Sequence, residues 1–113
     1  MGKLRDLIVS KVDLRYEIVE IPQWECSIKV QGLTAKQRSE LMRTSFIGNE
    51  VNLDIMYPKL VLASCYDPET DELIFDAGDA ELIMSKSGEV VEKLASTAMK
   101  LSGLSAESKI GKN

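Results

Sequence analysis

Two short runs with strand-like patterning, separated by four residues, limit the folds open to this chain more than any other feature. Residues 16–21, "YEIVEI", are rich in β-branched and aromatic side chains. Residues 26–31, "CSIKVQ", alternate between apolar and polar side chains, which is the period of a strand with one wet face. The intervening "PQWE" has a common hairpin-loop length, and Pro22 ends the first strand because its ring fixes φ. The sequence therefore predicts a β-hairpin with one apolar face that must be covered.

A helical pattern follows the predicted hairpin. Thr34 and Gln37 have the spacing of a capping box, in which each side chain bonds to the other residue's backbone N–H. We expect this helix to run from residue 35 to residue 46 or 47. Gly48-Asn49 is the expected stop, because both residues tolerate the left-handed backbone conformation.

Two more helices are predicted downstream. Apolar residues recur at helical spacing over residues 53–65, but Pro58 is unfavourable in a helix interior. We therefore expect the continuous helix to begin near residue 57, with Pro58 in its first turn. A polar turn, an extended "LIF" segment and a short helical "AELIMS" segment follow. The strongest helical pattern spans residues 88–101, with Ser87 as its cap and Gly103 as its stop.

These elements predict a small α+β domain, with an N-terminal β-hairpin packed on a bundle of about three to four α-helices. A length of 113 residues favours one domain, which we place at residues 16–103. Residues 1–15 are expected to form an N-terminal arm, for which the pattern leaves a short helix and an extended segment both open. Residues 104–113 are expected to form a polar, mobile tail.

Charge and hydropathy exclude several classes of partner. The chain has a net charge of −4 and its basic residues are scattered, so it lacks the basic stripe that phosphate binding requires. It also has no signal-peptide pattern and no apolar run of about 20 residues. We therefore expect a cytoplasmic protein that binds neither nucleic acid nor membranes and whose partner is another protein.

The residue types present do not predict catalysis. The chain contains no histidine, which removes the commonest general base and metal ligand. Without histidine, neither Cys26 nor Cys65 has an activating base. Each cysteine lies in an apolar pattern, so both are expected to be reduced and buried. We predict no enzyme activity, no catalytic residue and no cofactor.

The acidic loop partly resembles a calcium-binding loop. Asp67, Glu69 and Asp71 stand at alternating positions, as at the start of an EF-hand loop. However, Glu72 occupies the position that needs glycine, and Gly78 the position that needs a bidentate carboxylate. We interpret this segment as a solvated turn and predict no metal site.

Apolar side chains near the ends of elements are the candidates for protein contact. Most are equally compatible with core packing, whereas the loop position of Trp24 fits packing over the hairpin and anchoring of a partner about equally well. The candidate partner-binding residues are Trp24, Phe46, Ile47 and Met84.

Three segments resemble the tail assembly chaperones of long-tailed bacteriophages and their prophages. The first is "VEIPQWECSIKVQGLTAKQRSEL", which is similar to a family opening that runs from a "V-x-V/I-P-x-W" segment to "L-T/S-x-x-x-R" and a helix. The second is "KLVLASCYDPETDELIF", and the third is "KLSGLS". The family often has a glycine pair where this chain has Glu25-Cys26. The residues that carry the resemblance are Val19, Ile21, Pro22, Trp24, Leu33, Thr34, Arg38, Lys59, Leu60, Asp67, Thr70, Leu73 and Phe75.

The resemblance implies a non-enzymatic assembly factor. Such a protein would bind the tape measure protein and keep it soluble until tail tube protein polymerises around it. It would act in the host cytoplasm and be absent from the mature virion. The tape measure protein and the tail tube protein are the implied partners, and self-association is left open.

The resemblance also implies a longer form made by ribosomal frameshifting. The last three residues, Gly111-Lys112-Asn113, can be encoded as GGA AAA AAC, which contains two slippery patterns.

Two other functions remain open on sequence grounds. One is a permanent structural head–tail joining or tail-completion protein. The other is a small host adaptor that binds proteins.

Overall fold

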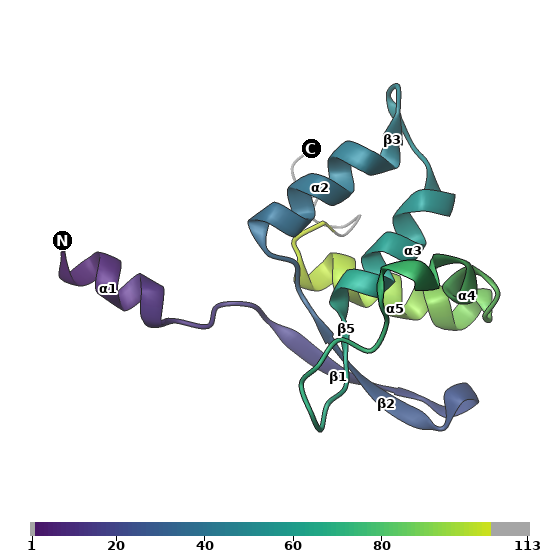
Figure 1. The fold of residues 1–113 in the computed structure, drawn as a ribbon, viewed down its shortest axis with the longest axis horizontal. Coiled ribbons are helices and arrows are strands. Elements are labelled where there is room, and N and C mark those ends of the chain that lie inside the picture. Colours follow the sequence, from purple (N-terminus) through teal and green to yellow (C-terminus); the bar gives the residue numbers. More distant parts are fainter. Residues whose placement is uncertain (1, 105–113) are drawn as a thin grey trace.

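The predicted hairpin forms the sheet of the molecule and is confirmed. A computed structural model describes residues 2–104 (Figure 1), and β1 (Tyr16–Ile21) pairs antiparallel with β2 (Cys26–Gln31). The corner between them is a 3-10 turn, η1 (Pro22–Trp24), followed by Glu25 in the left-handed conformation at φ 57°. A two-residue strand, β5 (Cys65–Tyr66), pairs with β2 and gives the order β1-β2-β5.

Helices cover one face of this sheet, as the apolar pattern requires. They are α2 (Ala35–Ser45), α3 (Leu53–Ser64), α4 (Ala80–Met84) and α5 (Gly88–Leu101), and Figure 1 shows them on the same side of the hairpin. Alternate residues of the two long strands and the inner stripes of α3 and α5 supply the core, so the predicted α+β fold is confirmed. The most deeply buried large side chains are Ile21, Ile28, Val30, Leu60, Val61, Ile83, Val90 and Leu94.

The predicted stop of the first helix is wrong. The helix ends at Ser45, and the next residues form a small hairpin of β3 (Phe46–Ile47) and β4 (Glu50–Val51). Gly48, at φ 65°, and Asn49 make the turn of this hairpin instead of ending the helix. The backbone N–H of Asn52 donates to the Ser45 carbonyl at 2.6 Å and closes the base of the hairpin.

The predicted start of the second helix is also wrong. The side-chain oxygen of Asn52 accepts from the backbone N–H of Asp54 at 2.9 Å, and this cap starts α3 at Leu53. Pro58 consequently lies inside the helix, where it has no N–H to offer the Asp54 carbonyl. Pro58 is buried, and its contribution to the core accounts for its tolerance at this position.

The remaining helix signals are confirmed. Thr34 and Gln37 form the full capping box, with bonds of 2.9 and 3.1 Å. Ser87 accepts from the Val90 backbone N–H and starts α5 at the predicted residue. Gly103 follows the helix at φ 77°, the left-handed conformation typical of a helix stop.

The N-terminal arm adopts the helical alternative. The helix α1 (Lys3–Ser10) has no buried residue, and it stands away from the body in Figure 1, joined to β1 by residues 11–15. At the other end, Leu104 is buried in the core, although it falls in the predicted tail. Residues 105–113, including the segment that carries the frameshifting prediction, lie outside the described residues.

Candidate functional site

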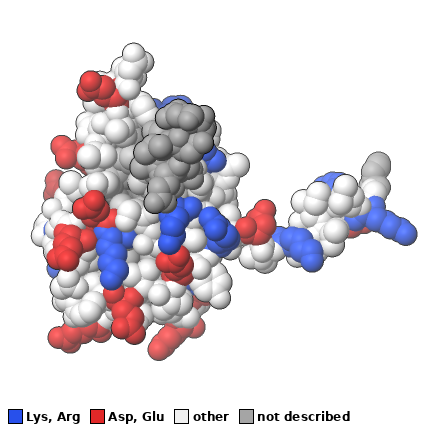
Figure 2. All heavy atoms as spheres, turned by 180° about the vertical axis from the view of Figure 1, so that it is seen from behind, with Lys and Arg blue, Asp and Glu red and all other residues white. Residues whose placement is uncertain are grey.

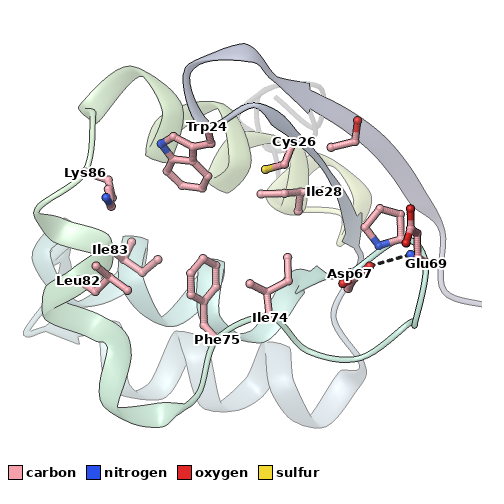
Figure 3. A pocket seen from close by; sticks show the side chains of 12 residues that line it. Trp24, Cys26, Ile28, Asp67, Glu69, Ile74, Phe75, Leu82, Ile83 and Lys86 are labelled. Atoms are coloured by element: carbon pink, nitrogen blue, oxygen red, sulfur yellow. Dashed lines mark hydrogen bonds between the residues drawn. The ribbon is translucent and has the colours of Figure 1, made fainter.

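A groove of about 660 Å³ opens beside the hairpin corner. Figure 3 shows its two walls: one carries side chains from the corner and β2, and the other carries side chains from the segment after β5 and from α4. The walls are mostly apolar. The lining residues are Trp24, Cys26, Ser27, Ile28, Asp67, Pro68, Glu69, Ile74, Phe75, Leu82, Ile83 and Lys86.

The hairpin corner holds Trp24 at the mouth of the groove. The η1 turn is closed by a bond of 3.1 Å from the Glu25 backbone N–H to the Pro22 carbonyl. Glu25 then turns the chain back into β2 through its positive φ, a conformation that side-chain-bearing residues adopt at a cost. As a result the indole is partly buried against the core and projects toward the groove in Figure 3.

A tight turn after β5 positions the opposite wall. Asp67 Oδ1 accepts from the backbone N–H of Glu69 at 2.8 Å, and Asp71, at φ 65°, pairs with Lys29 at 2.7 Å. The Ile74 backbone N–H donates to the Cys65 carbonyl at 3.1 Å and returns the chain to the edge of the sheet. This acidic segment is therefore a turn with internal hydrogen bonds, as the sequence predicted.

A second set of local bonds orients α4. Around the 3-10 turn η2 (Ala77–Asp79), Asp76 Oδ1 accepts from the Gly78 backbone N–H at 3.0 Å, and Asp79 Oδ2 accepts from the Asp76 backbone N–H at 3.0 Å. This cap starts the short helix so that Ile83 is fully buried while Leu82 is 44% exposed at the groove. The carboxylates thus have the structural role expected of acidic residues before a helix.

Opposite charges stand at the two ends of the groove. Figure 3 places Lys86 at the end of the groove nearer Trp24, and Asp67 with Glu69 at the other. The apolar walls between these ends suit an amphipathic polypeptide segment with charges outside its apolar face. The arrangement therefore combines apolar surface that is open to solvent with opposite charges at its two ends.

The two cysteines differ, and the prediction that both are buried is wrong for one of them. Cys65 is fully buried, and burial raises the pKa of its thiol from 9.0 to about 12. Cys26 is exposed because it begins β2 at the open groove. The Cys65 thiol is therefore held in its neutral, unreactive form.

Within residues 2–104, no group of three or more His, Cys, Asp or Glu side chains could hold a metal ion. Over the same residues, no helix is long and apolar enough to cross a membrane. On the face shown in Figure 2, basic side chains are interspersed with acidic ones and form no continuous stripe.

The structure does not gather the four sequence candidates into one site. Trp24 lines the groove, and Met84 is 45% exposed at the end of α4 but does not line it. Phe46 and Ile47, 38% and 64% exposed, lie on the β3–β4 hairpin, which Figure 1 shows far from the η1 corner.

Sequence reasoning missed most of the groove, including Ile74, Phe75 and Leu82. The "LIM" run of α4 contained no usable signal, because three successive apolar residues span about 200° of a helix at 100° per residue. Such a run does not indicate which side chain is buried and which is offered to a groove.

Comparisons with known proteins place the fold. No protein-family model matches the chain. No curated protein matches its sequence. Among solved structures, the bacteriophage HK97 tail assembly chaperone matches with a TM-score of 0.62 and 18% sequence identity, over 87% of this chain and 91% of that chain. The chain therefore has the fold of a tail assembly chaperone, and the fold implied by the sequence resemblance is confirmed.

Proposed function

We propose that this protein is a non-enzymatic tail assembly chaperone that binds the tape measure protein and keeps it soluble while the tail tube polymerises. One observation carries the proposal: a chain with the fold of the HK97 tail assembly chaperone has an open apolar groove bounded by opposite charges. An apolar groove on the surface marks a place for another molecule to bind.

The groove supports binding of a helical client segment. Trp24 and Phe75 offer aromatic surface from opposite walls, and Leu82 adds an exposed aliphatic side chain. Aromatic side chains dominate the energetics of many protein interfaces. A long client that repeats such segments would be held at many weak contacts, so that tail tube protein could displace the chaperone stepwise.

Co-expression with the tape measure protein tests this function. The wild-type chain should keep the client in the soluble fraction, whereas Leu82→Glu should lose that activity because it places a charge in the apolar groove. Leu53→Glu is the matched control, since Leu53 is exposed to a similar degree, 47% against 44%, and does not line the groove. Failure of the wild-type chain to keep the client soluble would contradict the proposal.

A further variant separates the groove from the other candidate surface. Ile47→Asp changes the β3–β4 hairpin and should leave client solubility intact, although Phe46 and Ile47 were sequence candidates. If Ile47→Asp abolishes activity and Leu82→Glu does not, the client binds at the small hairpin and the groove is the wrong site. Trp24→Ala should lower both client solubility and fold stability, because the indole also packs on the core.

The same proposal places the protein in the host cytoplasm and outside the mature virion. Mass spectrometry of purified particles should detect no peptide from it, whereas a permanent head–tail joining or tail-completion protein would be present in each particle. The longer frameshifted form is part of the proposal. Codons that break both slippery patterns, with no open reading frame continuing downstream, would contradict it.

A further inference from the structure

The N-terminal arm presents an apolar helix face that is exposed, and none of its residues is buried. Leu4, Leu7 and Ile8 follow the i, i+3, i+4 spacing of one helix face and are 69%, 50% and 62% exposed. The helix α1 has only eight residues, and no side chain caps its N-terminus at Gly2. Isolated helices shorter than about 12–15 residues are marginal in water. The arm helix therefore needs a surface to pack on.

The root of the arm is fixed at the end of the hairpin that lies opposite the groove. The Gly32 backbone N–H donates to the Arg15 carbonyl at 2.9 Å, and Arg15 Nη2 donates to the Lys100 carbonyl at 3.2 Å. From this point Figure 1 shows α1 directed away from the body, while Trp24 marks the far end of β1 and β2. The arm therefore leaves the body at the end of the hairpin opposite its own groove and points away from it.

Charge makes the arm and the rest of the chain complementary. Residues 1–15 carry four basic and two acidic side chains, whereas residues 16–113 carry ten basic and sixteen acidic ones. The same contrast holds locally, because Lys3 and Arg5 flank the apolar face of α1, and Asp67 and Glu69 close one end of the groove. Opposite charges of this kind favour and orient encounter between two copies.

We propose that α1 of one copy binds in the groove of a second copy. In this arrangement Leu4, Leu7 and Ile8 pack between the two groove walls, and the basic start of the helix lies toward the acidic end of the groove. The contact is of the helix-in-groove type, with anchors at i, i+3 and i+4. It requires no client and goes beyond the chaperone function, although arm and client would compete for one surface.

Self-association of the purified full chain, without client, tests the proposal by sedimentation velocity over a range of concentrations. The wild-type chain should associate in a concentration-dependent way. Leu7→Glu should raise the dissociation constant roughly tenfold or more, because it removes a central anchor and brings a charge to the groove. Val9→Glu is the matched control, since Val9 is 67% exposed on the opposite face of the same helix.

Mixing two variants tests whether the arm of one copy meets the groove of another. Leu7→Glu has a defective arm and an intact groove, and Leu82→Glu has the reverse. At a concentration where the wild-type chain associates, each variant alone should be largely monomeric, while their mixture should form a heterodimer with one intact contact. A concentration-independent monomer for the wild-type chain would overturn the proposal. So would equal weakening by Val9→Glu and Leu7→Glu, or a mixture that stays monomeric.

Discussion

At the scale of single residues, burial decides the chemistry of the two cysteines. Both stand in apolar sequence patterns, but Cys26 begins β2 at the open groove, whereas β5 places Cys65 inside the core. Burial raises the pKa of the Cys65 thiol to about 12, and the Ser64 hydroxyl nearby opposes this only in part. The sequence pattern alone cannot make this distinction, because it does not show which part of the apolar face the helices leave exposed.

Thiol labelling should report this difference. Under native conditions a thiol reagent should modify Cys26 and not Cys65, and unfolding in denaturant should expose both. The variant Cys26→Ser should therefore show no rapidly labelled thiol when folded and one when unfolded. Rapid native labelling of Cys65 in that variant would contradict its burial.

The same thiol links stability to alkaline pH. The pKa of Cys65 is about 12 in the folded chain, against 9.0 for a cysteine thiol in water, so the unfolded chain loses this proton first as the pH rises. The contribution of the neutral thiol is therefore fully present below about pH 9 and is lost between about pH 9 and 12. Urea unfolding provides the test. Between pH 8 and pH 10, the free energy of unfolding should fall less for Cys65→Ala than for the wild-type chain.

At the scale of elements, α2 and α3 end alike, and their last residues are both buried serines. Ser64 Oγ donates to the Leu60 carbonyl at 2.7 Å, as a hydroxyl inside a helix commonly does. Ser45 Oγ is equally buried but has no hydrogen-bond partner within the described chain. A buried hydroxyl without a partner costs stability.

Replacing these serines by alanine should have opposite effects. Ser45→Ala removes an unsatisfied polar group and should raise the free energy of unfolding by about 1 kcal/mol, whereas Ser64→Ala should lower it by about 1 kcal/mol. Denaturant unfolding measures both, and each variant serves as the control for the other. A shift of the same sign in both would mean that the hydrogen bonding of one of them is misassigned.

The elements also show which sequence signals predict the bounds of helices and strands correctly. The hairpin and the starts of α2 and α5 were predictable because alternation, a capping box and a serine cap act over a few neighbouring residues. The β3–β4 hairpin and β5 were missed, because a two-residue strand has no period and is defined by its pairing partner. The start of α3 was misplaced since Pro58 outweighed the less obvious cap at Asn52.

At the scale of the whole molecule, the sheet and α5 meet at Gly32. A Cβ atom at this position would lie 2.7 Å from the Leu101 carbonyl oxygen and 3.1 Å from its carbon, both of them backbone atoms. The Ser102 side chain accepts from the Leu33 backbone N–H at 2.9 Å in the same region. The end of β2 and the end of α5 are therefore in direct backbone contact, and glycine is what allows it.

Gly32→Ala should destabilise the whole domain. The sheet and α5 would have to separate, which we expect to cost about 1–3 kcal/mol, as other overpacked sites do. Gly88→Ala is the control, because its Cβ meets nothing within 4 Å and alanine favours a helix more than glycine does. Thermal unfolding should show a lower midpoint for Gly32→Ala and an unchanged or higher one for Gly88→Ala.

The groove could not be predicted from the sequence for a reason that also lies at this scale. Its walls come from residues 24–28, 67–75 and 82–86, which only the complete fold brings together. Trp24 was recognised because a lone tryptophan at a corner is unusual, whereas Phe75 and Leu82 stand in ordinary apolar runs. Sequence reasoning thus identified one residue of the groove, and the rest of its lining is evident only in the folded chain.

The contacts of Arg15, Gly32 and Leu104 have a practical meaning for anyone who labels or fuses this protein. Leu104 is buried next to the end of α5, whose Lys100 carbonyl binds the root of the arm. Polypeptide attached beyond Leu104 therefore starts close to where the arm leaves and at the opposite end of the hairpin from Trp24. A reporter that replaces residues 105–113 would leave the mouth of the groove open but would lie close to the root of the N-terminal helix.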